Sequence, residues 1–238
     1  MMPFQELLKR PLLIYLAHFG TFFKIIFIPL VFNVIINVAD VVTLNEPINI
    51  NRAFLLVSSV TLISILLAAL AELALVRTFF GYMQGETPSA GGMLSAALKK
   101  LPGFVAILVL WFLAVTVGFI FLIVPAIIFA TWFMFLSSVY MIEGAPTLEV
   151  FRRSKNLVSP HFVSVLWRIT LASVIFVGVL FTASRGIQFI LELLGANPVI
   201  SYNIVSGVSA TLGALLLPVY VGVIVTMYLE IRNANKPL

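Results

Sequence analysis

The chain has 238 residues, of which 62% are hydrophobic and only 10% are charged, and its formal net charge is +5. Soluble domains average about 45–50% apolar and about 25% charged residues, so these few charges cannot supply the polar surface of a soluble globule. The chain has no cysteine, which excludes disulfides, thiolate metal sites and cysteine nucleophiles.

The first segment, residues 3–19, is predicted to be an amphipathic helix that lies at the membrane surface. Glu6, Lys9 and Arg10 are interspersed there with leucine, phenylalanine and tyrosine. No small-residue cleavage site follows and the apolar character continues, so we expect the segment to be retained rather than removed as a signal peptide. Gly20 is the expected break before the first membrane span.

Six apolar segments follow, each close to the roughly 20 residues that a helix needs to cross about 30 Å of hydrocarbon. They are predicted at about 22–42, 53–76, 102–123, 126–142, 162–183 and 202–229. The third and fourth share one run, 101–142, that contains no Asp, Glu, Lys, Arg or His. This run has room for two spans, and Pro125 is the expected turn residue of the hairpin between them. We therefore predict an all-α polytopic membrane protein, with residues 1–238 forming a single six-helix transmembrane domain that carries amphipathic surface helices.

The basic residues are divided unequally between the two sides that six spans create. If both termini share a side with the connections 77–100 and 143–168, that side carries eleven basic residues: Lys9, Arg10, Arg77, Lys99, Lys100, Arg152, Arg153, Lys155, Arg168, Arg232 and Lys236. The opposite side carries Arg52 and Arg185, and Lys24 can extend to the majority side. Because connections rich in Lys and Arg stay in the cytoplasm, we predict a multi-pass protein of the bacterial inner membrane with both termini cytoplasmic.

The two basic connections resemble each other at an offset of 58 residues. Pro88 and Pro146 are each followed by a hydroxyl residue, and Pro102-x-Phe-Val matches Pro160-x-Phe-Val. Each copy predicts a surface helix started by a proline, which suits the first turn of a helix, and then a second proline before the next span.

A longer pattern carries a family resemblance. It comprises Ile123-Val124-Pro125-Ala126-Ile127-Ile128, then Glu143-Gly144, then Arg152-Arg153-Ser154-x-x-Leu157-Val158. Over residues 102–167 it resembles the membrane domain that precedes some membrane-bound glycerophosphoryl diester phosphodiesterases, and stand-alone inner-membrane proteins of the YciC type. The chain departs from that pattern at Ala126, where glycine is common, and around Thr131-Trp132, where a basic residue is often found. The resemblance implies a six-span bundle without the soluble phosphodiesterase domain, which argues against an enzyme.

A predicted surface helix at 147–158 carries three basic residues, Arg152, Arg153 and Lys155. Its apolar residues, which we expect to anchor it in the membrane surface, are Leu148, Phe151, Leu157 and Val158. Each basic residue near an anionic leaflet contributes about 1 kcal/mol, so the cluster is a candidate contact for anionic lipids. Orientation of the chain by its positive charges explains the same cluster, and Glu143 and Glu149 could pair with the two arginines.

The first two spans contain polar residues that form a candidate path through the membrane. Asn33, Asn37 and Asp40 recur on one face of span one, and Glu72 lies one turn from the cytoplasmic end of span two. Ionisable residues within spans often mark solute or ion pathways. Hydrogen bonding between helices, and an ion pair from Glu72 to Arg77 or to a loop arginine, account for the same residues.

The last span carries small residues at a spacing that lets helices approach closely: Ser206, Gly207, Ala210, Gly213 and Ala214. We expect packing within the chain, with a homo-oligomer as the alternative. Catalytic motifs are absent from the sequence: Gly207-Val208-Ser209 lacks the second glycine of a nucleophile elbow, and no zincin or phosphate-loop motif occurs.

These observations favour a non-enzymatic membrane protein that acts as a scaffold or accessory for envelope lipids or another membrane protein. The alternative is a small-solute or ion transporter that uses the polar residues of spans one and two. We expect membrane lipids, and either another membrane protein or a second copy, as partners. We expect no catalytic residue, metal, cofactor or nucleic acid.

Overall fold

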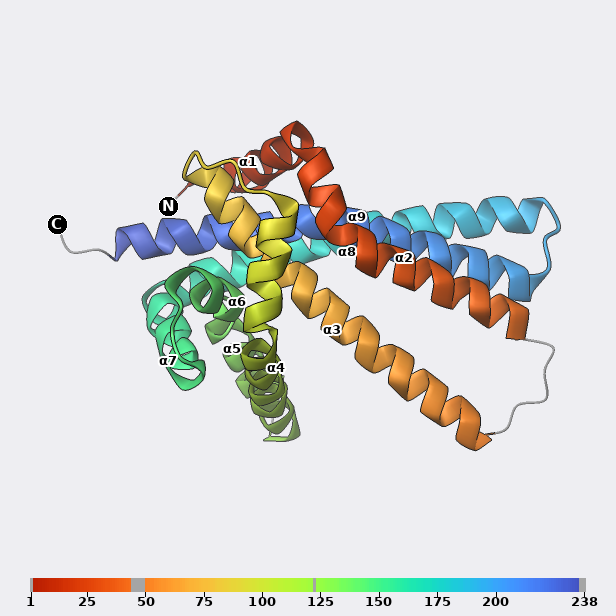
Figure 1. Cartoon of the computed structure of the whole chain (residues 1–238), viewed down its shortest axis with the longest axis horizontal. Helices are drawn as coiled ribbons and strands as arrows, with labels where there is room; N and C mark the ends of the chain where they lie inside the picture. The colour runs from red at the N-terminus through yellow and green to blue at the C-terminus, as the bar shows by residue number, and fades with distance from the viewer. Residues whose placement is uncertain (1, 44–49, 122, 236–238) are drawn as a thin grey trace.

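The computed structural model describes residues 2–43, 50–121 and 123–235, and within them all side chains except those of 37–43, 50–54, 56, 121 and 199. This part of the chain is helical apart from short connections. It contains six segments that are long and apolar enough to cross a membrane (Figure 1). The predicted all-α fold with six spans is confirmed.

In chain order the helices are α1 (Phe4–Ala17), α2 (Phe19–Thr43), α3 (Ile50–Met83), α4 (Ala90–Phe121), α5 (Ile123–Trp132), α6 (Leu136–Ser138), α7 (Thr147–Val158), α8 (Phe162–Leu193) and α9 (Pro198–Ala234). A π-helical turn, η1 (Val139–Glu143), follows α6, and a 3₁₀ turn, η2 (Ser159–His161), joins α7 to α8. The long helix α9 packs against α1, α2, α3 and α8, so it forms the centre of the bundle.

The packed core lies at one end of the bundle, where α1, the end of α9, the 84–89 loop and α7 come together (Figure 1). We call this the basic end. Fully buried side chains such as Phe79 and Tyr228 are concentrated there, in the second halves of α3 and α9. Toward the opposite end, α3 and the α4–α5 pair diverge from α2, α8 and α9 (Figure 1), and large apolar side chains such as Phe112 and Ile120 are exposed. Hydrocarbon solvates such side chains well, so the helices gain little from closing there.

The helix ends at the basic end differ from the prediction. α1 and α2 meet at His18, and Gly20 lies in the first turn of α2, so the predicted break at Gly20 was wrong. The bend is fixed by contacts of His18, whose ring Nδ1 lies 3.2 Å from the Ile14 carbonyl and whose ring stacks on Tyr82 with centroids 3.9 Å apart. Most of the predicted connection 77–100 is helical, because α3 continues to bury its apolar face in the core up to Met83.

The two copies of the 58-residue pattern fold differently. In the first copy α4 is continuous through Pro102, so the predicted surface helix and span three are one helix. In the second copy η2 separates α7 from α8, and Pro160 lies in that turn. A proline inside a helix removes one backbone hydrogen bond, which a long packed helix tolerates. The second proline of the pattern therefore does not by itself set where a span begins.

The fourth predicted span, 126–142, is interrupted. α5 ends at Trp132, and the chain passes through α6 and η1 before Glu143. α4 ends at Phe121 and α5 begins at Ile123, so Pro125, the expected turn residue, lies in the first turn of α5. A close approach holds this hairpin: a Cβ placed on Gly118 would lie 2.9 Å from the backbone nitrogen of Ala126. The predicted tight hairpin is present, and glycine at 118 is required for it.

Candidate functional site at the basic end

The surface helix α7 is held on the bundle by its apolar face. The side chains of Leu157 and Val158 are buried against protein, and the Ser154 hydroxyl donates to the carbonyl oxygen of Trp132 at 2.7 Å. The prediction that Leu157 and Val158 anchor the helix in lipid was therefore wrong. Leu148, on the outer face, is 77% exposed. Burial of Leu157 and Val158 contributes about 1.5–3 kcal/mol for each side chain. α7 is therefore a fixed part of the basic end.

The two arginines of α7 are paired with acidic residues, as the sequence suggested. Arg152 Nη2 lies 3.0 Å from Glu149 Oε1, and both side chains are largely exposed. Arg153 Nε lies 2.9 Å from Glu143 Oε2, and only 18% of the Glu143 side chain is exposed. The second ion pair links α7 to the end of η1.

Lys155 differs from the two arginines. Its ammonium nitrogen lies 4.4 Å from the centroid of the Trp132 ring, which is a cation–π contact. Within the part of the chain that the structure describes, Lys155 has no acidic partner. It is therefore the basic residue of α7 whose charge is available to an outside anion.

Glu143 belongs to a hydrogen-bonded cluster that joins α4, η1 and α9. The Tyr228 hydroxyl donates to Glu143 Oε1 at 2.6 Å. The Lys100 ammonium group donates to the carbonyl oxygen of Tyr140 at 3.1 Å, and the Tyr140 hydroxyl donates back to the Lys100 carbonyl at 3.1 Å. A π-helical turn leaves carbonyl groups without their usual α-helical partners, and Lys100 satisfies one of them. The cluster fixes where α7 lies relative to the spans.

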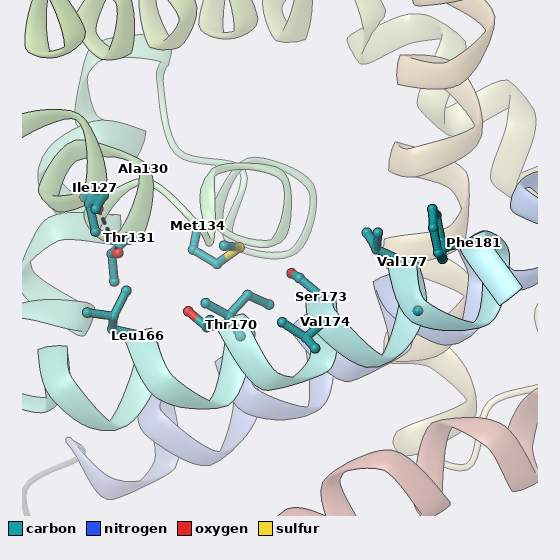
Figure 2. Close-up of a pocket in the computed structure, with 12 residues that line it drawn as sticks. Ile127, Ala130, Thr131, Met134, Leu166, Thr170, Ser173, Val174, Val177 and Phe181 are labelled. Atoms are coloured by element: carbon teal, nitrogen blue, oxygen red, sulfur yellow. Dashed lines mark hydrogen bonds between the residues drawn. The ribbon is translucent and has the colours of Figure 1, made fainter. Parts of the chain in front are cut away.

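An apolar cavity of about 610 Å³ lies between α5 and α8. Figure 2 shows side chains of α8 pointing into it along one face, opposite Ile127, Thr131 and Met134. The cavity is open to the surroundings, because Val174 and Val177 on its wall are 62% and 60% exposed. Its lining is Ile127, Ala130, Thr131, Met134, Leu166, Ile169, Thr170, Ser173, Val174, Val177, Gly178 and Phe181.

The basic helix α7 lies beside one end of this cavity. Trp132, which carries Lys155 over its ring, directly follows the cavity residue Thr131 at the end of α5. From the last turn of α7 the chain enters α8 through η2, and Leu166 in the second turn of α8 is the first cavity residue on that helix. An exposed cation is thus placed where an apolar cavity begins.

The structure describes the side chains of two of the four residues of the predicted polar path, Asn33 and Glu72. The Asn33 amide donates to the Pro29 carbonyl of its own helix at 2.8 Å. Asn37 and Asp40 belong to α2, but their side chains lie outside the described residues. Glu72 interacts with the hydroxyl of Ser137 in α6. Neither Asn33 nor Glu72 lines the α5–α8 cavity, nor do they line two smaller cavities described along α8 and α9.

The ion pair that the sequence suggested for Glu72 is also not seen. Among the described residues Arg77 pairs with Glu86, at 3.9 Å, in the loop that follows α3. The Glu72 carboxyl group therefore has a hydroxyl neighbour and no described basic partner.

One buried ion pair was missed by the sequence analysis, which counted its arginine with the charges of the connection. Arg168, in α8, lies 3.1 Å from Glu230 of α9 and donates to the Met2 carbonyl oxygen at 2.8 Å. Only 8% of the Arg168 side chain and 14% of the Glu230 side chain are exposed. Charged residues within apolar helices usually pair with one another. The sequence therefore offered a signal for this pair, an arginine early in one span and a glutamate late in another.

The small residues of the last span lie against α8 within the chain, at ordinary contact distance. A Cβ placed on Gly213 would lie 3.9 Å from the Leu180 side chain of α8, and the hydroxyls of Ser184 and Ser209 are 2.7 Å apart across the same two helices. This face of α9 packs within the chain.

Comparisons with protein-family models, with curated proteins and with solved structures find no match to this chain. The resemblance to the membrane domain of glycerophosphoryl diester phosphodiesterases and to YciC-type proteins therefore stays a prediction.

Proposed function

We propose that the chain is a non-catalytic protein of the bacterial inner membrane that holds an envelope lipid or another membrane protein at its basic end. The observation that carries the proposal is the open α5–α8 cavity beside the basic helix α7. A cavity that opens between spans is reached from the bilayer rather than from water, so its occupant is a molecule that resides in the membrane.

The chemistry of the cavity supports binding rather than catalysis. Its described lining has three hydroxyl side chains and includes no acidic or basic one. Thr131 donates to the Ile127 carbonyl at 2.7 Å, and the Ser173 and Tyr220 hydroxyls lie 3.0 Å apart. A serine or threonine nucleophile needs an adjacent base, and the cavity lining offers none.

The charge distribution supports an orientation with the basic end in the cytoplasm. An even number of spans puts both termini on one side, and Met2 and Glu230 are in contact at the basic end. Moving the lysines and arginines of that end across a membrane is costly, so they remain on the side of synthesis.

A photo-crosslinking amino acid introduced at Val174 tests the proposal in intact membranes. Val174 lines the cavity, whereas Leu171 lies on the same helix at nearly the same depth and does not line it. We expect a defined lipid or protein adduct at Val174 that is absent at Leu171. The same adducts at both positions, or none at Val174, would contradict the proposal.

A second function is favoured by one observation, the Glu72 carboxyl group within a span beside Ser137. An ionisable group in such a place is often part of a proton or ion path. Purified protein in vesicles that conducts an ion or solute, with the flux lost in Glu72→Gln, would replace the scaffold proposal by a transporter. We expect no such flux.

A further inference from the structure

The α5–α8 cavity has the dimensions of an acyl-chain site. On α8 its lining runs from Leu166 to Phe181, which at 1.5 Å per residue is roughly 22 Å. The hydrocarbon of one leaflet is about 15 Å deep, half of the bilayer core. A helix of that length and about 10 Å across would need roughly 1,700 Å³. The cavity volume is about 610 Å³, so the cavity can take up a single hydrocarbon chain but cannot enclose a transmembrane helix.

The charge at the end of the cavity selects the head group. Arg152 and Arg153 are engaged by Glu149 and Glu143, whereas Lys155 is held over the Trp132 ring without a described acidic partner. The aromatic contact positions the ammonium group without neutralising its charge. Tryptophan and lysine are both favoured where hydrocarbon meets the polar head groups. The ligand that matches this pairing has an apolar chain and an anionic group at its polar end.

We infer that the α5–α8 cavity binds one anionic glycerophospholipid, with an acyl chain along α8 and its phosphate at Lys155. This inference rests on the proposed function and deepens it by naming the class of occupant. A compact ammonium group suits a phosphate as a point charge. The Thr170 hydroxyl lies in the cavity wall (Figure 2) and has no hydrogen-bond partner in the described structure, so it offers a donor to the lipid.

Two pairs of variants separate this site from general attraction to the membrane. Lys155→Gln and Arg152→Gln each remove one positive charge from the same helix, but Arg152 is already paired with Glu149. Gly178→Leu places a side chain in the cavity, whereas Gly186→Leu places it elsewhere on the same helix. A Cβ added at either glycine meets nothing within 4 Å, so both positions have open space where a new side chain begins.

The assay is native mass spectrometry of the full chain, titrated with phosphatidylglycerol and with phosphatidylcholine of the same acyl chains. We expect the native protein to prefer one phosphatidylglycerol molecule, and Lys155→Gln to reduce this preference about fivefold, the effect of one basic residue near an anionic head group. Arg152→Gln should change it less than twofold. Gly178→Leu should weaken binding of both lipids at least tenfold, because displacing two buried methylene groups already has that effect. Gly186→Leu should bind as the native protein does.

Equal losses in Lys155→Gln and Arg152→Gln would mean that the charge acts as a diffuse surface effect, and would overturn the inference. Unchanged binding in Gly178→Leu would show that the cavity is not the site and would also overturn it. If either result is obtained but the photo-crosslinker at Val174 forms an adduct with a protein, the proposed function still holds. If the photo-crosslinker at Val174 forms no adduct in the otherwise native protein, the proposed function is wrong as well.

Discussion

Replacing Arg168 by methionine should destabilise the protein strongly, because it breaks a buried ion pair. Arg168 donates hydrogen bonds to Glu230 and to the Met2 carbonyl, and both charged side chains are less than 15% exposed. Removing Arg168 takes the arginine counter-charge away from the buried Glu230 carboxylate, which keeps its contact with the Met2 backbone. Such losses cost about 3–5 kcal/mol in buried sites. We expect Arg168→Met to lower the free energy of unfolding by that amount.

A double-mutant cycle distinguishes loss of the pair from loss of packing. In Arg168→Met combined with Glu230→Met both charges of the pair are removed together, and the two methionines occupy similar space. Replacing both members of a buried ion pair by apolar residues is often close to neutral. We expect the double variant to unfold within about 2 kcal/mol of the native protein, so the coupling between the two sites should exceed 1 kcal/mol.

The assay is unfolding in mixed micelles by increasing sodium dodecyl sulfate, followed by circular dichroism. The matched control is Arg152→Met, whose ion pair with Glu149 is exposed and should contribute less than about 1 kcal/mol. If Arg168→Met is as mild as Arg152→Met, or if the double variant is less stable than Arg168→Met alone, the ion pair does not hold the N-terminal segment, α8 and α9 together.

Two further predictions concern the packing of the basic end and of the hairpin. Tyr228→Phe leaves Glu143 Oε1 without its 2.6 Å donor, so the free energy of unfolding in mixed micelles should fall by about 1–3 kcal/mol; no change would show that this bond is not needed. Gly118→Ala places a Cβ 2.9 Å from the Ala126 backbone and should lower the free energy of unfolding by about 1–3 kcal/mol. Gly178→Ala places its Cβ in open space and should raise the free energy of unfolding by up to about 1 kcal/mol. The same unfolding assay measures both glycine variants, and equal effects would contradict the close hairpin.

The number and order of the spans could be predicted because the signal is local. Length, apolar runs and the absence of charge decide whether a helix can lie in hydrocarbon, and no knowledge of neighbours is needed. The unbroken run 101–142 predicted the α4–α5 hairpin in this way. The hairpin's close approach at Gly118 was not foreseen, because it depends on Ala126 facing it.

The helix breaks could not be predicted, because contacts between distant residues fix them. His18 ends α1 where it stacks on Tyr82, sixty-four residues later in the chain. Pro102, a strong local signal, does not end α4, although a proline inside a helix costs about 3 kcal/mol. The packing of α4 against α3 and α5 holds the helix together there.

Part of the candidate site could be predicted from the sequence. The acidic partners of Arg152 and Arg153 were identified because they are close in sequence. The position of Lys155 over Trp132 was not, since a contact across twenty-three residues requires the fold. The α5–α8 cavity was also invisible, because it arises from the divergence of helices whose sequences are equally apolar.

The absence of cysteine makes one measurement decisive for the orientation and the number of crossings. Single cysteines can be introduced at Asn156 in α7 and at Leu194 after α8, both of which are exposed, and labelled with a membrane-impermeant maleimide. Six spans with a cytoplasmic basic end predict that Leu194→Cys is labelled in intact spheroplasts and Asn156→Cys only in inverted vesicles. Labelling of both positions from the same side would contradict the account.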